Sequence, residues 1–476
     1  MKVVSVFLVA VSLFFINGFR SHAQEAWTLQ QCIDYALSHN ISVKQSELNE
    51  DFSKESFQQS KAGFLPNLNG NASQNYFYGR SIDPTTNLYT NNEVRSNNFS
   101  LSSSVPVFEG FQLQNALKQS KLNYLSSQYD LEKIKNDISL TVVTYYLQIL
   151  YNRELLQSTT ERVNATRIQR DKAQRMYELG AVAKGSLLEF EAQFSGDEVQ
   201  LVNAQSLLDQ SILSLTQLLE LDSVKDFTIV EPVVEIAAMS IPVEDANSIY
   251  SIALKTQPDI KSFEYKVMSA EKGLSVARAG RYPRLSVGGS ISTNYSSASQ
   301  TFTTSPSGNY PIIGFAFDTI PVYSASSGFN VEAKEKSFKS QFDDNISKFV
   351  GFSLSVPIFN GWSAKTNINH AKINLQRSQL NLQSTKKSLY KSIQQAVSDA
   401  KSANKRYQAN DKSVQSLNES FSYNEQKFNT GMISLYDYLL SKNNLAKAKA
   451  DLLQAKYDFI FRIKVLDFYL GKPLAF

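Results

Sequence analysis

Two stretches of the chain alternate apolar and polar residues with a period of two, which is typical of β-strands with one apolar face. They lie within residues 66–106 and 283–357, and each contains two runs, so the pattern predicts four strands. A transmembrane β-barrel shows this alternation, and so does the edge of a soluble β-sandwich. The apolar face is assigned Leu68, Gly70, Ala72, Tyr76, Tyr78, Phe99, Leu101, Ser103, Val105, Leu285, Val287, Gly289, Ile291, Val350, Phe352, Leu354 and Val356, and the polar face Asn67, Asn69, Asn71, Ser100, Ser102, Ser286, Ser290, Ser353 and Ser355.

Two long segments, 107–179 and 358–430, contain no proline and carry apolar residues every three or four positions. They predict helices about 110 Å long at 1.5 Å per residue. The apolar stripes are narrow, as in a coiled-coil seam, and the polar remainder suits a thin wall with water on both sides. A free fibrous coiled coil would explain the helices equally well but would leave the strands without a role. Shorter helices are predicted at 27–64, 181–221, 244–281 and 432–470.

The chain repeats itself, because the phrase SVPVFEGF at 104–111 returns as SVPIFNGW at 355–362, an offset of 251. Upstream of the phrase the matching offset is 217, so the second extended insert is longer by the difference between the two offsets. We therefore predict two structural repeats, 24–221 and 244–476, joined by an equatorial connector at 222–243.

Four prolines, Pro66, Pro106, Pro283 and Pro357, are expected to end the strands and open the helices. The segments between strands, Ser81–Asn92 and Ser296–Asn345, are read as polar turns outside the cell. Four strands cannot close a barrel, and an open edge in lipid would leave backbone groups unpaired. The predicted fold class is therefore mainly α with membrane β, in which three copies share a twelve-stranded barrel.

The first 23 residues read as a secretory signal peptide, with a basic start, an apolar core and small residues before a cleavage site near Ala23. Beyond them no apolar run approaches the roughly 20 residues of a membrane-spanning helix. The exported chain is then either soluble in the periplasm or crosses a membrane as β-strands. With 48 basic and 44 acidic residues, its charge argues against nucleic acid as a partner.

Residues able to carry catalysis are scarce. The single cysteine, Cys32, supports neither a disulfide framework nor a lipid anchor and is expected to be a buried free thiol. The three histidines, His22, His39 and His370, have no partner at metal-ligand spacing, and nucleophile-elbow and phosphate-loop motifs are absent. We predict no enzymatic activity, no cofactor and no metal site.

The duplicated VPxFxG phrase at 105–110 and 356–361, together with glycine corners at Gly180 and Gly431, resembles the TolC family of outer-membrane efflux proteins. The resemblance covers essentially the whole mature chain. It implies a homotrimer whose shared β-barrel lies in outer-membrane lipid and continues into a long α-helical barrel across the periplasm.

The resemblance also implies partners and cargo. Such channels bind a periplasmic adaptor, also called a membrane fusion protein, and an inner-membrane transporter, and they export drugs, metal ions or polypeptides without catalysing a reaction. The alternative from the residues is a periplasmic coiled-coil structural or adaptor protein without a pore, which would not need detergent.

By the same resemblance the glycine corners are the periplasmic tips that contact the adaptor, although they could equally be plain turns. The predicted contact residues are Leu179, Gly180, Ala181, Val182, Thr430, Gly431, Met432 and Ile433.

A periplasmic gate is expected beside the second corner. In the best-known family member two aspartates narrow the entrance, and the corresponding positions here are Asp437 and Leu440, so one acidic ring remains. Capping is a competing role, because Ser434 and Asp437, like Ser186 and Glu189, have capping-box spacing. That member's locking arginine and acid are replaced here by Ile433 and Ser186. The resting gate is therefore expected to depend on apolar contacts of Phe428, Ile433 and Leu440.

Overall fold

The computed structural model describes residues 26–82, 87–90, 93–222, 227–232 and 245–474. The predicted signal peptide and residues 223–226 and 233–243 of the predicted connector therefore lie outside the described residues. The described part confirms a mainly helical chain that also contains antiparallel strands. No helix among these residues is both long and apolar enough to cross a membrane.

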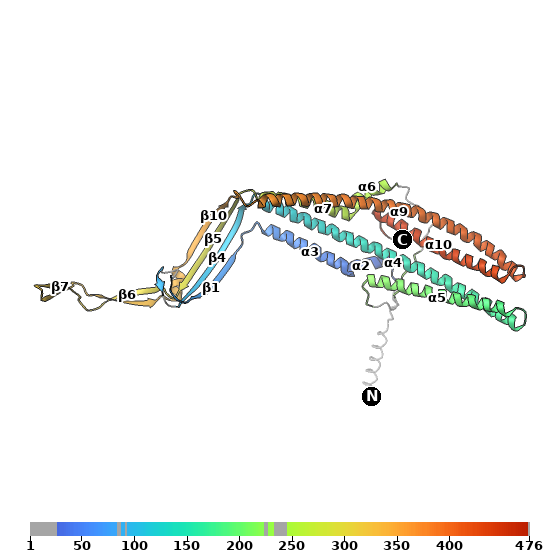
Figure 1. Ribbon diagram of the computed structural model, residues 1–476, viewed down its shortest axis with the longest axis horizontal. Helices are drawn as coiled ribbons and strands as arrows, with labels where there is room; N and C mark the ends of the chain where they lie inside the picture. Colours follow the sequence, from blue (N-terminus) through green and yellow to red (C-terminus); the bar gives the residue numbers. More distant parts are fainter. Residues whose placement is uncertain (1–25, 83–86, 91–92, 223–226, 233–244, 475–476) are drawn as a thin grey trace, which may run out of the picture. The chain divides into compact units, whose positions relative to one another are not determined.

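The chain divides into two compact units (Figure 1). The first unit is helical and takes its residues from 1–54, 121–268 and 376–476, and the second contains the strands and takes 55–120 and 269–375. The helices are α2 (Leu29–His39), α3 (Ile41–Ala62), α4 (Gln112–Glu178), α5 (Lys184–Leu218), α6 (Ala246–Thr256), α7 (Pro258–Ala279), α8 (Phe338–Asp344), α9 (Ser363–Asn429) and α10 (Leu435–Tyr469).

The helical unit has two main apolar clusters that occupy equivalent positions in the two repeats. In the first, Val142 of α4 and Leu215 of α5 are fully buried around α2. In the second, the residues 251 positions later, Ile393 and Leu466, are buried around α6. Burial of one stripe on each helix is what the narrow apolar pattern predicts.

Cys32 is fully buried in the first cluster, as expected for a free thiol. Its counterpart 217 residues later, Ile249, is buried in the second cluster, so this cysteine occupies an apolar core position. Burial raises the pKa of the Cys32 thiol to about 12.

The predicted helices at 27–64 and 244–281 are each divided in two, and both divisions fall at the same repeat position. Asn40 ends α2 with ψ 130°, and its side-chain oxygen accepts the N–H of Ser42 at 2.9 Å, which caps α3. Gln257 ends α6 with ψ 125°, because Pro258 disfavours a helical conformation in the preceding residue. The hydrophobic pattern continues through both breaks and therefore conceals them.

The strand unit has a four-stranded antiparallel sheet in the order β1 (Asn69–Phe77), β4 (Val94–Phe108), β5 (Arg284–Ser296) and β10 (Ser347–Ser355). Residues paired across strands share a face. Asn71 pairs with Ser100, and Leu101 pairs with Ile291, so polar and apolar residues are separated between the two faces of β1, β4 and β5. On β10, Lys348 paired with Ile291 and Phe349 paired with Ser290 are exceptions. The sheet thus has the two faces that the alternation predicts.

Pro106 does not end its strand, contrary to expectation. β4 continues to Phe108 through a register shift between Pro106 and Phe108, where a proline is tolerated. The following helix therefore begins at Gln112 rather than at 107, after Gly110 at φ 61°. A Cβ on Gly110 would lie 2.5 Å from the Cβ of Tyr282, so this turn needs glycine for space as well as for conformation.

The predicted polar turn at Ser296–Asn345 is wrong, because the segment contains regular structure. Phe338 of α8 packs on Tyr295, and the buried Gln341 side chain bonds both the N–H and the carbonyl of Ser296. The shorter segment between β1 and β4 contains the minimal strands β2 (Ser81–Ile82) and β3 (Tyr89–Thr90). The longer segment contains β6 (Gln300–Pro306), β7 (Ile312–Ala316), β8 (Ile320–Tyr323) and β9 (Phe329–Glu335).

Candidate functional site

The predicted tips are the two turns that join α4 to α5 and α9 to α10, both within the helical unit. In the first, Ala181 N–H donates to the Met176 carbonyl at 2.8 Å and Gly180 N–H to the Tyr177 carbonyl at 2.9 Å. This pair of hydrogen bonds closes the C-terminus of α4 and requires a residue in the left-handed conformation, here Gly180 at φ 75°.

The second turn repeats this geometry 251 residues later. Met432 N–H donates to the Lys427 carbonyl at 2.8 Å, Gly431 N–H donates to the Phe428 carbonyl at 3.0 Å, and Gly431 has φ 73°. Nothing lies within 4 Å of a Cβ built on Gly180 or Gly431. The backbone conformation, rather than lack of space, therefore calls for glycine at both turns.

Both turns expose large apolar side chains. Leu179 is 83% exposed and Met432 76% exposed. Gly180, Ala181, Thr430 and Gly431 are also exposed, whereas Val182 and Ile433 are half-buried. Apolar side chains held at an exposed, rigid turn are suited to contact another protein.

An apolar cluster lies next to these turns and joins the two helical hairpins. At its centre is Tyr438 of α10, 1% exposed, whose ring stacks on Phe428 with centroids 4.5 Å apart. Leu187 and Phe190 of α5 belong to the same cluster, and Ile433 packs against it. Two of the four predicted gate residues, Phe428 and Ile433, are therefore packing residues of this cluster.

The other two predicted gate residues, Asp437 and Leu440, are exposed on α10, so the four residues do not form one group. Ser434 Oγ accepts the Asp437 N–H at 3.2 Å and donates to Asp437 Oδ2 at 2.6 Å. The capping role foreseen at Ser434 is thus present. The equivalent cap at Ser186 is wrong, because α5 begins at Lys184 and Ser186 lies inside the helix.

A buried carboxylate near this cluster was missed by the sequence analysis. Asp197 of α5 is 3% exposed, and its oxygens lie 3.1 Å from Arg162 Nε and 2.7 Å from Thr166 Oγ1, both on α4. The signal was present in the sequence: Leu187, Phe190, Phe194 and Asp197 continue one stripe of α5. An acid within an apolar stripe predicts a buried pair.

Lys442 of α10 extends this polar group to the second hairpin. Its Nζ donates to Thr166 Oγ1 at 3.1 Å and to Gln169 Oε1 at 2.9 Å, and Gln169 in turn bonds the Tyr438 hydroxyl. Burial lowers the pKa of Lys442, an effect that the Asp197 carboxylate opposes. We call Arg162, Thr166, Gln169, Asp197 and Lys442 the polar network.

The polar network has no copy in the second repeat. The counterpart of Asp197 at the 251-residue offset is Ala448, which is 9% exposed. A cavity of about 390 Å³ adjoins the network, and Arg162, Glu425, Lys442 and Lys449 contribute to its lining. Beside this cavity the two repeats have diverged in chemistry while keeping the same backbone plan.

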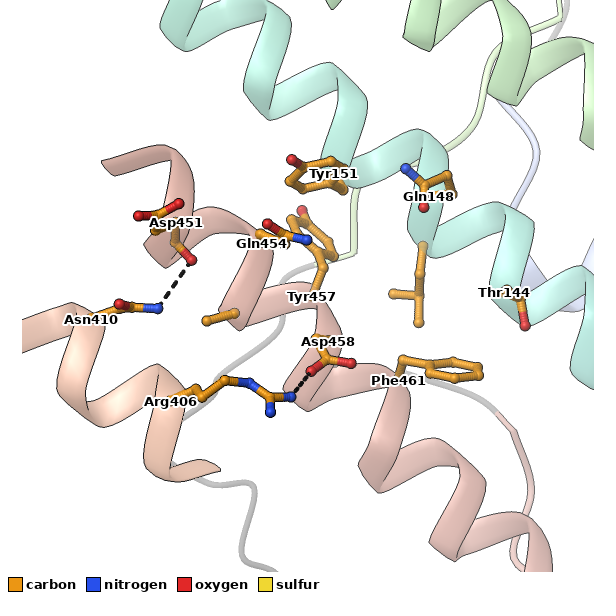
Figure 2. A pocket seen from close by; sticks show the side chains of 12 residues that line it. Thr144, Gln148, Tyr151, Arg406, Asn410, Asp451, Gln454, Tyr457, Asp458 and Phe461 are labelled. Carbon is orange, nitrogen blue, oxygen red and sulfur yellow. Dashed lines mark hydrogen bonds and ion pairs between the residues drawn. The ribbon is translucent and has the colours of Figure 1, made fainter. Parts of the chain in front are cut away.

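A second cavity, of about 710 Å³, lies among α4, α9 and α10 (Figure 2). Figure 2 shows Arg406 of α9 paired with Asp458 of α10, at 2.5 Å, and Asn410 bonded to the Asp451 carbonyl. Tyr457 donates to Glu154 of α4 at 2.9 Å, and its burial, reinforced by Glu154, raises its pKa. These contacts connect α4, α9 and α10.

In the part of the chain that the structure describes, no group of three His, Cys, Asp or Glu side chains could hold a metal ion.

The sequence model of the outer membrane efflux protein family matches residues 32–220 and 249–472. The Outer membrane protein TolC of Escherichia coli is 22% identical over 175 residues, 36% of each chain, so the match spans about a third of that relative. The Probable efflux pump outer membrane protein TtgC of Pseudomonas putida is 22% identical over 341 residues, 68% of this chain and 69% of that one.

Among solved structures, CusC, whose crystal structures are described in terms of folding and transmembrane channel formation, superposes with a TM-score of 0.75. The superposition covers 94% of this chain and 92% of that one at 18% identity. At this identity the likeness establishes the fold.

Proposed function

Because this chain belongs to the outer membrane efflux protein family, we propose that it forms a channel through which molecules leave the cell across the outer membrane. The observation that carries the proposal is the exposed apolar face of the four-stranded sheet. On β10, Val350 and Phe352 are each 78% exposed and Leu354 is 65% exposed. Such a face is stable against lipid and unfavourable against water.

The same sheet supports a trimer. Among the residues that the structure describes, its edge strands, β1 and β10, each pair on one side only. In lipid an unpaired edge is excluded, because its backbone N–H and carbonyl groups would have no partner. If β10 of one copy pairs with β1 of the next, three copies close a barrel of twelve strands, which is above the usual minimum of eight.

The long helices support a conduit beyond the membrane. α4 and α9 have 67 residues each, about 100 Å at 1.5 Å per residue. We propose that they form the wall of a periplasmic barrel, with their remaining polar faces toward water and toward neighbouring copies. A tunnel of this kind suits small molecules or extended polypeptides.

The exposed turns are the proposed docking site for a periplasmic adaptor, which would link the channel to an inner-membrane transporter. Among the predicted tip residues, Leu179 is 83% exposed and Met432 is 76% exposed. Flexible apolar side chains such as methionine fit a helical partner well.

We further propose that Asp437 and Leu440, exposed on α10, line the periplasmic entrance in the trimer. Three symmetry-related carboxylates would attract cations and repel one another. Phe428 and Ile433 would not line the entrance but would hold the turn beside it in place, a role that their packing in the cluster with Tyr438 supports.

The first test is the mass of the detergent-solubilised protein, measured by light scattering and corrected for bound detergent. We expect three chain masses, because one chain cannot close its sheet. A single chain mass for protein that stays soluble without detergent would contradict the channel. That result would favour the alternative, a periplasmic coiled-coil protein without a pore.

A further inference from the structure

The insert between β5 and β10 contains a two-stranded ribbon, β6 paired with β9, that has one apolar and one polar face. The register makes this clear, because directly paired side chains lie on the same face. One face presents the pairs Phe302 with Ala333, Thr304 with Val331 and Pro306 with Phe329, with Gln300 and Glu335 paired at its base, and the other presents Thr301 with Lys334, Thr303 with Glu332 and Ser305 with Asn330.

The hairpin that continues this ribbon, β7 paired with β8, is more apolar still. From Tyr310 to Tyr323 the only charged residue is Asp318. Ile313 is 69% exposed and Phe317 is 92% exposed. We call residues 300–335, from the start of β6 to the end of β9, the distal ribbon.

The apolar face of the distal ribbon is exposed in the part of the chain that the structure describes. Phe302, Phe329 and Val331 are each more than 60% exposed. Isolated two-stranded ribbons are marginally stable in water, and contiguous exposed apolar surface marks a binding surface. This face therefore needs a partner to remain ordered.

We infer that this partner is the same face of the distal ribbons of the other two copies in the trimer, an inference that rests on the proposed function. The ribbon is inserted between β5 and β10, and β10 is the edge strand that would join the neighbouring copy. Each ribbon therefore leaves the sheet next to a junction between copies. Three-fold symmetry then places three identical ribbons around one axis, and the inferred packing turns their apolar faces toward it.

The charges are compatible with this packing. Glu332 and Lys334 lie on the polar face, and the one charged side chain on the apolar face, Glu335 at the base of the ribbon, bonds the Tyr295 hydroxyl. Apolar contact between like faces also avoids the repulsion that three identical charged faces would suffer.

Lipid fits the ribbon less well than protein does. β5 has 13 residues, about 44 Å at 3.4 Å per residue, and even when tilted it exceeds an apolar band of about 25 Å. β5 begins directly after α7, and the ribbon follows the opposite end of β5. Since β5 alone is long enough to cross the apolar band, the ribbon lies beyond the part of the chain that the band needs. Its base is held by Lys336 N–H bonded to the Ser299 carbonyl at 2.9 Å.

Single cysteines on the two faces test the inference. In a Cys32→Ser background, Val331→Cys places a thiol on the apolar face, and Glu332→Cys is the matched control on the polar face one residue away. After oxidation in isolated outer membranes, we expect Val331→Cys to give disulfide-linked pairs of chains several-fold more abundantly than the control. Equal linkage at both positions, or none at Val331→Cys, would overturn the inference.

Two further measurements separate the possible failures. Light scattering of each variant reports the oligomer, so a trimer without linkage contradicts the ribbon packing alone, whereas loss of the trimer in the parent protein contradicts the proposed function as well. A nitroxide attached at Val331→Cys reports its surroundings. If it is more accessible to oxygen than to a water-soluble nickel chelate, the ribbon faces lipid and the packing between copies is wrong.

Discussion

At the scale of single residues, the polar network is the feature that departs most from the repeat. Asp197 is 3% exposed, and its carboxylate contacts Arg162 and Thr166. Removing one member of a buried pair leaves the other charge uncompensated, which costs more than the pair itself contributes.

We expect Asp197→Asn to lower the free energy of unfolding by about 3 kcal/mol, the lower end of the usual range because the Arg162 side chain is 26% exposed. Denaturant unfolding of the detergent-solubilised protein at fixed protein concentration measures this change. The matched control is Asp137→Asn, which breaks the exposed pair of Lys133 and Asp137. It should change the free energy by less than about 1 kcal/mol. Equal effects of the two substitutions would show that the network does not stabilise the fold.

At the scale of elements, helix ends are decided by a few local bonds. The breaks at Asn40 and Gln257 occupy equivalent positions in the two repeats, although one depends on a side-chain cap and the other on the following proline. The turns at Gly180 and Gly431 share one backbone geometry. Backbone geometry has thus been kept at both positions, by different residues at the helix breaks and by glycine at both turns.

Replacing a turn glycine and a helix glycine by alanine should change the stability of the protein in opposite directions. Gly180→Ala should destabilise the protein by about 1 kcal/mol, because alanine disfavours a positive φ. Gly196→Ala, in the exposed middle of α5, should stabilise it by about 0.5–1 kcal/mol, because alanine favours helix. Neither substitution meets an atom within 4 Å. Denaturant unfolding of both variants measures the difference, and a loss of stability for Gly196→Ala would contradict this account.

At the scale of the whole molecule, the proposed trimer explains features that a single chain leaves unsatisfied. In the described part of the chain the sheet has two unpaired edges and an exposed apolar face, and the distal ribbon has a second such face. In the proposed trimer the exposed Asp437 would place three carboxylates around one axis, in addition to its contact with Ser434.

We expect Asp437→Asn to lower the preference of the open channel for cations over anions, because it removes three negative charges from the entrance. Reversal potentials in planar bilayers under a salt gradient measure this preference. Glu132→Gln, at an exposed position of α4, should leave the cation preference nearly unchanged. An unchanged reversal potential for Asp437→Asn would assign that carboxylate to capping alone.

Much of the architecture could be predicted from the sequence, because it follows from local periodicity. The period of two specified the faces of β1, β4, β5 and β10, the narrow apolar stripes specified the long helices, and the repeated glycines marked both turns. The helix breaks escaped prediction, since a cap at Asn40 leaves the apolar spacing intact. The strands within 296–345 escaped as well, because their apolar residues stand among many serines and glycines.

The sequence by itself determined the duplication, the alternating strands and the glycine turns, because each depends on residues close together in the chain. Only the tertiary structure decided that Lys442 meets Thr166, 276 residues away, and that Phe428 and Ile433 are packed while Asp437 and Leu440 are exposed. The physical reason is that burial and pairing depend on which helix faces meet, and no local pattern specifies that.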